Sequence, residues 1–267
     1  MIEQDSNTDR NKDWWEKMVK EGCGYTRPWL NLEKKEIQQY IHNPQRTPNV
    51  QLGTMFPTYI LSNVDGKDVL CLASGGGQQS AVFSLLGALV TVVDISEGQL
   101  EGDRKAAKHY GYEITTMRAD MRDFSLIENG SFDLVYQAPS MSYIPAVREV
   151  YAEVARVLRS GGLYRVAHTN PAVEFIETDS WDGEGYRISL PYTVSQVEYG
   201  EAGSVQFRHY LGDIFNGLLE EGFSIQRVQE APVHFQEASD ASPGTWEHSQ
   251  IYAPWTFAIV ARSSGED

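Results

Sequence analysis

Three consecutive glycines and one aspartate have the types and spacing that nucleoside binding requires. Gly75–Gly77 come shortly after the apolar run Val69–Leu72, and Asp94 follows Gly77 by 17 residues. Glycines after a strand permit positive φ angles and let the backbone approach a ligand without a Cβ in the way. A carboxylate at the end of the next strand is placed to accept hydrogen bonds from the two hydroxyls of a ribose. The pattern therefore predicts a nucleoside site.

The elements that must position these residues form a βαβ unit. Val69–Leu72 lies between Asp65-Gly66 and the glycines, which is typical of a short strand buried on both faces. Residues 78–86 carry helix-compatible side chains and predict a crossover helix, and Val90–Val93 predicts a second strand that ends at Asp94. The glycines and the acid are thus expected at the same edge of a parallel sheet.

These residues resemble the class I S-adenosylmethionine-dependent methyltransferases, whose first motif is an apolar strand that runs into a Gly-x-Gly-x-Gly turn. Ala73, Gly75 and Gly77 stand at the three glycine positions, so Ala73 replaces the first glycine. Alanine is small enough to leave room for the ligand. The resemblance implies S-adenosylmethionine as the cofactor and no metal.

Later motifs of the same family follow in its order. Asp120 comes after the strand-like stretch 112–117, Asp133 opens an apolar fourth strand, and Gly161-Gly162 precede a fifth strand. Together with the glycine turn, these motifs span roughly residues 65–170, with spacing that fits βα units. These motifs of the resemblance therefore cover the first five predicted strands.

The resemblance also implies roles for the residues at the strand ends. Asp94 would bind the ribose and Ile95 would lie beside the adenine, while Asp120 and Met121 would contact the adenine through side chain and backbone. Gln137-Ala138 would lie near the methionine amino group or the methyl group. The residues expected beneath the methionine portion all belong to the glycine turn: Ala73, Ser74, Gly75 and Gly77.

Three residues are candidates for a catalytic base. A sulfonium methyl group is already activated, so the enzyme must align an acceptor with the carbon–sulfur bond and, where needed, remove its proton. His168 ends the predicted fifth strand, where side chains of an α/β sheet reach the ligand crevice. His209 precedes a late helix, and Tyr143 follows the fourth strand. Each could be a base, bind the acceptor or serve the fold, and the sequence leaves these roles open.

The predicted fold is α/β, with a seven-stranded, mostly parallel sheet, an antiparallel last strand and helices on both faces. Residues 1–64 are expected to form an N-terminal helical cover, and residues 65–267 the methyltransferase domain, with a lid inserted at about 171–205. Within the cover, helices are expected near 13–21, 32–42 and 52–63. The insertion is rich in aromatic and acidic residues, which suit a pocket for a cationic or aromatic acceptor. We favour the simpler interpretation that its rings pack and its acids are solvated. Among these residues are Glu174, Phe175, Trp181, Tyr186 and Tyr199.

The composition is strongly acidic, with a formal net charge of -15 over 267 residues. Nucleic acids are held by clustered Lys and Arg, and no run of these residues exceeds two, so nucleic-acid substrates are disfavoured. There is no stretch of 18 apolar residues, and residues 1–13 are polar, so we expect neither a membrane span nor a signal peptide, and a cytoplasmic location. Cys23 and Cys71 give no disulfide framework and no metal spacing. The oligomeric state is not indicated.

The favoured function is methyl transfer to a small-molecule acceptor by in-line displacement. An NAD-dependent oxidoreductase competes, because its Gly-x-Gly-x-x-Gly fingerprint also precedes an acid by about 20 residues. However, Ser80 stands where its third glycine would be. A non-catalytic protein that binds S-adenosylmethionine or S-adenosylhomocysteine would share Asp94 and Asp120. An aminopropyl transferase would need an acidic groove after the fourth strand, which residues 137–140 do not supply.

Overall fold

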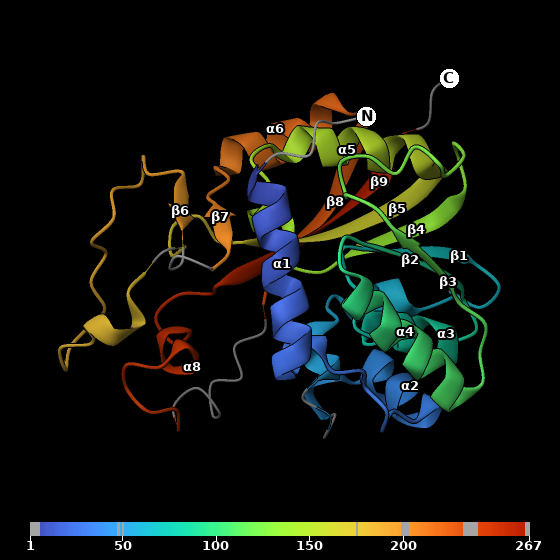
Figure 1. Ribbon diagram of the computed structural model, residues 1–267, viewed down its shortest axis with the longest axis horizontal. Coiled ribbons are helices and arrows are strands. Elements are labelled where there is room, and N and C mark those ends of the chain that lie inside the picture. Colours follow the sequence, from blue (N-terminus) through green and yellow to red (C-terminus); the bar gives the residue numbers. More distant parts are fainter. Residues whose placement is uncertain are drawn as a thin grey trace.

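The main feature of the protein is a seven-stranded sheet with the order β3-β2-β1-β4-β5-β9-β8, which fans out in Figure 1. The computed structural model describes residues 6–46, 49, 51–174, 176–198, 203–231 and 240–264. The strands of this sheet are β1 Asp68–Leu72, β2 Leu89–Asp94, β3 Thr115–Arg118, β4 Phe132–Gln137, β5 Leu158–Thr169, β8 Phe223–Glu230 and β9 Thr256–Ser263.

Strand directions agree with the expected sheet. The four pairs that link β3, β2, β1, β4 and β5 are parallel, and β9 lies antiparallel between β5 and β8. The predicted seven-stranded sheet with an antiparallel last strand is therefore confirmed. Because the parallel strands run the same way, β1, β2, β4 and β5 all end at one edge, which we call the carboxyl edge.

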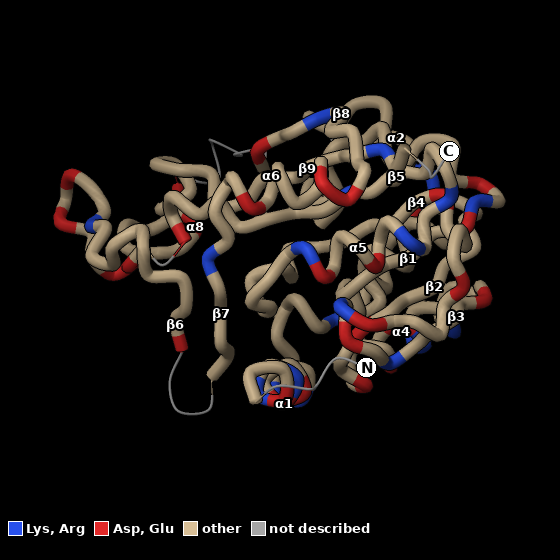
Figure 2. Tube along the Cα trace, turned by 90° about the horizontal axis from the view of Figure 1, so that it is seen from above, with Lys and Arg blue, Asp and Glu red and all other residues tan. Residues whose placement is uncertain are grey.

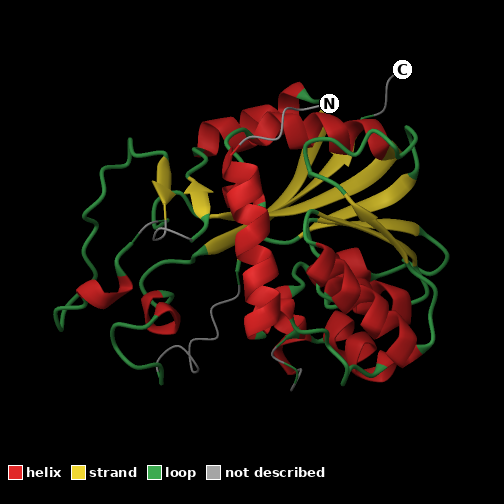
Figure 3. Cartoon of the chain, viewed as in Figure 1, coloured by secondary structure: helices red, strands yellow, loops and turns green. Residues whose placement is uncertain are grey.

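Helices cover both faces of the sheet (Figure 3). They are α2 Lys34–His42, α3 Gln79–Leu85, α4 Glu97–Tyr110, α5 Val147–Val157 and α6 Leu211–Glu220. Side chains of α2, α3 and α4 form one buried cluster with Val69 and Cys71, and side chains of α5 and α6 form a second with Leu70 and Leu72. Successive residues of β1 thus point into different clusters, and this is why its run is continuously apolar.

The N-terminal segment differs from the prediction in two places. Its first helix, α1 Ser6–Glu21, begins earlier than residue 13, and it packs against α4 and β7 Val205–Phe207 (Figure 1). The helix predicted over 52–63 was wrong, because the structure has two 3₁₀ turns, Leu52–Thr54 and Thr58–Leu61. Pro57 stands between these turns and has no N–H to donate to a helical carbonyl.

β5 begins directly after α5, earlier than predicted. Leu158 pairs with Phe132, and the register then shifts so that Leu163 pairs with Leu134. Gly161, with φ 73°, lies among the residues looped out between these pairs. The turn expected ahead of the fifth strand is therefore a bulge within it.

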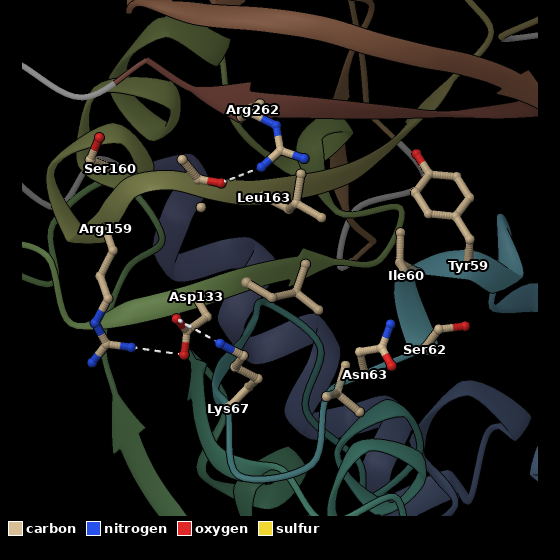
Figure 4. A pocket seen from close by; sticks show the side chains of 14 residues that line it. Tyr59, Ile60, Ser62, Asn63, Lys67, Asp133, Arg159, Ser160, Leu163 and Arg262 are labelled. Atoms are coloured by element: carbon tan, nitrogen blue, oxygen red, sulfur yellow. Dashed lines mark hydrogen bonds and ion pairs between the residues drawn. The ribbon is translucent and has the colours of Figure 1, made fainter.

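Ion pairs hold the amino ends of β1, β4 and β5 together (Figure 4). Arg159 lies 2.9 Å from Asp133 Oδ2 and 2.8 Å from Asp68 Oδ2, and Asp133 also accepts the Asp68 N–H at 3.0 Å. Lys67 Nζ lies 3.8 Å from the other Asp133 oxygen. Lys67, Asp133 and Arg159 line a pocket at the sheet edge opposite the glycine turn, so Asp133 aligns strands and is remote from the predicted site.

The described part of the insertion after β5 is mostly irregular, with one short strand. β6 Gln196–Glu198 forms an antiparallel pair with β7, and the rings of Trp181 and Tyr186 pack at 5.1 Å. Phe175 and Tyr199 lie outside the described residues. That residues 171–205 act as a lid and residues 1–64 as a cover stays a prediction. The remaining short elements are the 3₁₀ turns Gly24–Thr26, Pro44–Arg46, Met141–Tyr143 and Thr178–Ser180, and α8 Trp246–Ser249.

Among the helices that the structure describes, none has both the length and the apolar character needed to cross a membrane.

Candidate cofactor and acceptor site

The glycine turn, residues 73–77, joins β1 to α3 at the carboxyl edge. Ala73 has φ 44°, in the left-handed region that glycine adopts without strain. Ala73 therefore keeps the conformation expected of a glycine at that position, at some energetic cost. A Cβ on Gly75 would lie 2.7 Å from the Gln99 Cβ and 2.9 Å from Asp94 Oδ2. The space at position 75 therefore requires glycine.

Asp94 ends β2 beside this turn. Its Oδ2 accepts the Gly75 N–H and its Oδ1 accepts the Ser96 N–H, each at 2.9 Å. The residue is 9% exposed, and burial raises its pKa to about 6, although the two backbone hydrogen bonds favour the ionised form. A carboxylate has about four lone-pair sites, so Asp94 can keep both backbone bonds and still accept ribose hydroxyls.

A second buried carboxylate, Asp103 of α4, holds the same turn, and the sequence analysis missed it. Its Oδ2 accepts the Gly76 N–H at 2.9 Å, and its Oδ1 accepts the Gly77 N–H at 3.0 Å and the Ser80 hydroxyl. Burial raises the pKa of Asp103 to about 7. The hydrogen bond from Asp103 thus holds Gly77 in its left-handed conformation, with φ 73°.

The residues predicted for the adenine follow β2 and β3. Ile95 and Met121 are half-buried. The Asp120 carboxylate is paired with Arg122, whose Nη2 lies 2.8 Å from Oδ2 and whose Nε lies 3.1 Å from Oδ1. Arg122 also donates to Thr8 of α1 at 2.7 Å. Asp120 therefore lies just after β3 and is already paired with an arginine, and its contact with the adenine stays a prediction.

The end of β4 is tied to the glycine turn. The Ala138 N–H donates to the Ser74 hydroxyl at 3.0 Å. The Gln137 side chain is buried, where its Nε2 donates to Ser140 at 3.0 Å and its Oε1 accepts the Tyr164 hydroxyl. The structure therefore brings Ser74 and Ala138 together. The Gln137 amide group is already hydrogen-bonded to other side chains of the protein.

α1 crosses the carboxyl edge over these residues. Glu16 Oε1 accepts the Ser96 hydroxyl at 3.0 Å, at the start of α4. Asn11, 4% exposed, donates to the carbonyls of Tyr143 and Val205 at 3.0 Å each and accepts the Val205 N–H at 2.7 Å. α1 therefore links the start of α4, the loop after β4 and β7.

Two of the three base candidates meet at the loop after β4. Tyr143 is half-buried, and its ring lies edge-on to Trp15 of α1 with 5.6 Å between centroids. His209 is 8% exposed, its Nε2 lies 2.9 Å from the Met141 carbonyl oxygen, and burial lowers its pKa. His209 thus fixes the loop that carries Tyr143.

His168, the third candidate, lies in the core. It is 1% exposed, its Nε2 lies 2.9 Å from the Tyr151 hydroxyl, and its ring stacks on Phe257 at 5.8 Å. Burial lowers its pKa to about 3, so the imidazole is neutral at physiological pH. His168 packs α5 against β5 and β9, and a catalytic role for it stays a prediction.

Glu174 stands out among the acids of the insertion. It is 5% exposed, and its side-chain Oε1 has no hydrogen-bond partner among the described residues. Arg208 donates to the Glu174 carbonyl at 2.9 Å, and burial raises the pKa of the Glu174 carboxyl to about 8. A buried polar atom without a partner is costly, so this oxygen is suited to a ligand.

Comparison with known proteins identifies the family. Residues 70–166 match the family described as "Methyltransferase domain". The uncharacterized methyltransferase YbaJ of Bacillus subtilis is 31% identical over 234 residues, which cover 82% of this chain and 89% of YbaJ. The chain belongs to the methyltransferase family.

Solved structures share the fold of this methyltransferase. An S-adenosylmethionine-dependent methyltransferase from Mesorhizobium loti, 24% identical, covers 74% of this chain and 92% of its own length with a TM-score of 0.63. Geranyl diphosphate C-methyltransferase from Streptomyces coelicolor, solved with Mg²⁺, geranyl diphosphate and S-adenosylhomocysteine, is 13% identical, covers 99% and 100%, and has a TM-score of 0.64. These structures thus confirm the expected class I fold. The methyltransferase family to which the chain belongs confirms the enzyme class and S-adenosylmethionine as the cofactor.

The hydrogen bonds of the glycine turn in this methyltransferase fit that cofactor. The N–H groups of Gly75, Gly76 and Gly77 all point to carboxylates. A dinucleotide places its pyrophosphate on such N–H groups, whereas S-adenosylmethionine has no phosphate. The turn is therefore unsuited to NAD. Within the described residues, no group of His, Cys, Asp and Glu could hold a metal ion.

Proposed function

We propose that this methyltransferase transfers the methyl group of S-adenosylmethionine to a small-molecule acceptor by in-line displacement. The observation that carries the proposal is α1, which Glu16 and Asn11 fasten across the carboxyl edge by hydrogen bonds of 2.7–3.0 Å. A helix held across this edge would hinder the approach of a folded polymer more than that of a small molecule.

The charge distribution also supports a small acceptor. The net charge is -15, and Figure 2 shows Lys and Arg scattered among Asp and Glu along the described chain. A nucleic-acid substrate would require clustered basic residues. Geranyl diphosphate C-methyltransferase, a protein of the same fold, was solved with a small molecule of the kind proposed. The likeness supports the class of acceptor and not its identity.

In this proposal the chain binds and orients, because the cofactor, when bound, supplies a methyl group that its sulfonium centre already activates. Asp94 holds the ribose, and the glycine turn holds the methionine portion. Rate enhancement then comes mainly from fixing the acceptor in line with the carbon–sulfur bond. α1 excludes water from that edge.

Tyr143 and Glu174 are assigned to the acceptor side. Tyr143 is half-buried beneath α1, and Glu174 offers a buried oxygen that lacks a protein partner within the described residues. Glu174 can accept a hydrogen bond from a hydroxyl or ammonium group of the acceptor and, when ionised, can take its proton. His209 positions the loop of Tyr143, so the proposal assigns it no proton transfer.

Methyl-labelled S-adenosylmethionine tests the proposal. The protein is incubated with the label and with a cell extract divided by dialysis into small molecules and macromolecules. We expect label in the small-molecule fraction, and much less of it with Asp94→Asn. Label in nucleic acid or protein would overturn the proposal. Labelling of neither fraction, with S-adenosylhomocysteine still bound, would favour a non-catalytic binding protein.

A further inference from the structure

α4 contacts the glycine turn through backbone as well as side chain. Asp103 accepts the N–H groups of Gly76 and Gly77 at 2.9 and 3.0 Å, and the Gly76 N–H is shared with the Gln99 carbonyl of α4 at 3.0 Å. One residue earlier, a Cβ on Gly102 would lie 2.9 Å from both the carbon and the oxygen of the Gly76 carbonyl. The helix and the turn are therefore in direct backbone contact, and this contact brings the Asp103 carboxylate within reach of the two N–H groups.

No cation shields this carboxylate among the described residues. Asp103 is fully buried, and the titratable groups that interact with it are Asp94 at the end of β2, Cys71 of β1 and Tyr112 after α4. Its charge is balanced only by the two N–H groups and the Ser80 hydroxyl. An asparagine could accept only one of the two N–H groups, because its own NH₂ would face the other.

We propose that Asp103 is a positioning residue that holds the Gly76 and Gly77 N–H groups toward α4 and so fixes the turn in the shape that receives the methionine portion of the cofactor. The same bonds deny these N–H groups to a phosphate. Asp103 thereby sets a preference for a nucleoside without phosphate. The inference rests on binding of S-adenosylmethionine and is independent of the acceptor.

Asp103→Asn and Glu101→Gln form a matched pair of variants on one helix. Glu101 is 70% exposed in its side chain and pairs with Arg104 at 2.9 Å. By calorimetric titration we expect Asp103→Asn to bind S-adenosylhomocysteine about tenfold more weakly or worse, because a buried N–H loses its acceptor. Glu101→Gln should bind normally. Hydrogen exchange of the cofactor-free protein should show lost protection in Asp103→Asn alone, and chiefly at Gly77, because the Gly76 N–H also donates to the Gln99 carbonyl at 3.0 Å.

Ser80→Ala separates positioning from stability, because it keeps the Asp103 carboxylate and removes one bond that favours its ionised form. In the wild type, affinity for S-adenosylhomocysteine should rise with pH through about 7, as Asp103 ionises. The midpoint near pH 7 should move to higher pH in Ser80→Ala, and this step should vanish in Asp103→Asn, which keeps only the rise from Asp94 at lower pH. A purely structural residue would change stability without moving this midpoint.

Two results would overturn the proposal. One is wild-type affinity together with wild-type protection of Gly76 and Gly77 in Asp103→Asn; the other is an unmoved pH midpoint in Ser80→Ala. If Asp103→Asn does not fold, the Ser80→Ala profile decides alone. Failure to find a methylated small molecule would leave these binding results intact, so this proposal and the proposed function fail separately.

Discussion

Asp94 and Asp103 are kept out of water beneath one turn, and burial raises their pKa values to about 6 and about 7. Between the ordinary pKa of an aspartate and these values, the folded chain binds more protons than the unfolded chain. Each residue's contribution to stability is therefore present at low pH and lost as pH rises through its folded pKa. Holding the cofactor turn with carboxylates costs stability near neutral pH.

Cofactor binding should draw a proton from Asp94. Ribose hydroxyls favour the ionised carboxylate, so affinity for S-adenosylhomocysteine should rise with pH up to about 6, with a proton released on binding below that value. Asp94→Asn should bind roughly 10- to 100-fold more weakly and should release fewer protons, because only Asp103 remains to ionise. Calorimetry in two buffers of different ionisation enthalpy measures the number of protons released on binding. Equal proton release by both proteins would contradict the assignment.

His168 has the opposite pH dependence. Its pKa is lowered to about 3 in the folded chain, so the unfolded chain binds more protons below the ordinary histidine pKa, and stability is lost as pH falls. His168→Gln keeps a partner for Tyr151 but cannot take the proton. We expect the free energy of unfolding of the wild type to fall more steeply with acid than that of the variant, by urea denaturation. Parallel curves would show that His168 titrates normally.

At the scale of elements, α1 depends on Asn11 for its hold on the carboxyl edge. Asn11→Ala removes three hydrogen bonds, at 2.7–3.0 Å, to Tyr143 and Val205. We expect the free energy of unfolding to fall by about 1–3 kcal/mol and protease to cut α1 sooner. Lys17→Ala, at an exposed position on the same helix, is the control. Unchanged proteolysis in Asn11→Ala would show that α1 is held elsewhere.

The ion pairs at the amino ends of β1, β4 and β5 should affect stability without affecting cofactor binding at the carboxyl edge. Asp133→Ala removes the acceptor shared by Arg159 and the Asp68 N–H, so the free energy of unfolding should fall by about 1–2 kcal/mol. Affinity for S-adenosylhomocysteine should stay the same, because these groups lie at the other edge of the sheet. Thermal denaturation and titration of one preparation test both halves. Loss of binding without loss of stability would contradict a purely structural Asp133.

The sheet could be predicted because the parallel strands have recognisable local sequence patterns. Val69–Leu72 is continuously apolar, and the glycines and Asp94 mark two strand ends. The prediction of a helix over 52–63 was wrong because Pro57 lacks the N–H that a continuous helix needs, and two 3₁₀ turns form instead. The roles of Glu16 and Asn11 could not be predicted from local sequence, since their hydrogen-bond partners lie far along the chain.

Asp103 did leave a signal. It shares the buried face of α4 with Leu100, Ala106 and Ala107, three or four residues away, where an acid is unexpected. An unpaired carboxylate on the apolar face of an amphipathic helix is thus a pattern that could have identified it. What the sequence cannot supply is its partner, since the two glycine N–H groups come from another element.

For the molecule as a whole, the charge of -15 predicts how it meets polyanions. Electrostatic binding to nucleic acid is strongest at low salt, and an acidic chain with dispersed basic residues should still show none. We expect no shift of transfer RNA or duplex DNA in a native gel at low ionic strength. A complex that weakens as salt is added would reveal a local basic groove and would argue against a small acceptor.

The place of β9 bears on how the molecule is made. β9 follows every other strand of the sheet in the chain, yet it lies between β5 and β8. During synthesis, β5 shows an unpaired edge and β8 has no partner until residues 256–263 have left the ribosome. Unpaired strand edges recruit other chains, so a stalled or truncated nascent chain would be prone to aggregate. Of the described strands in this sheet, the last to be translated is the one that pairs with both β5 and β8.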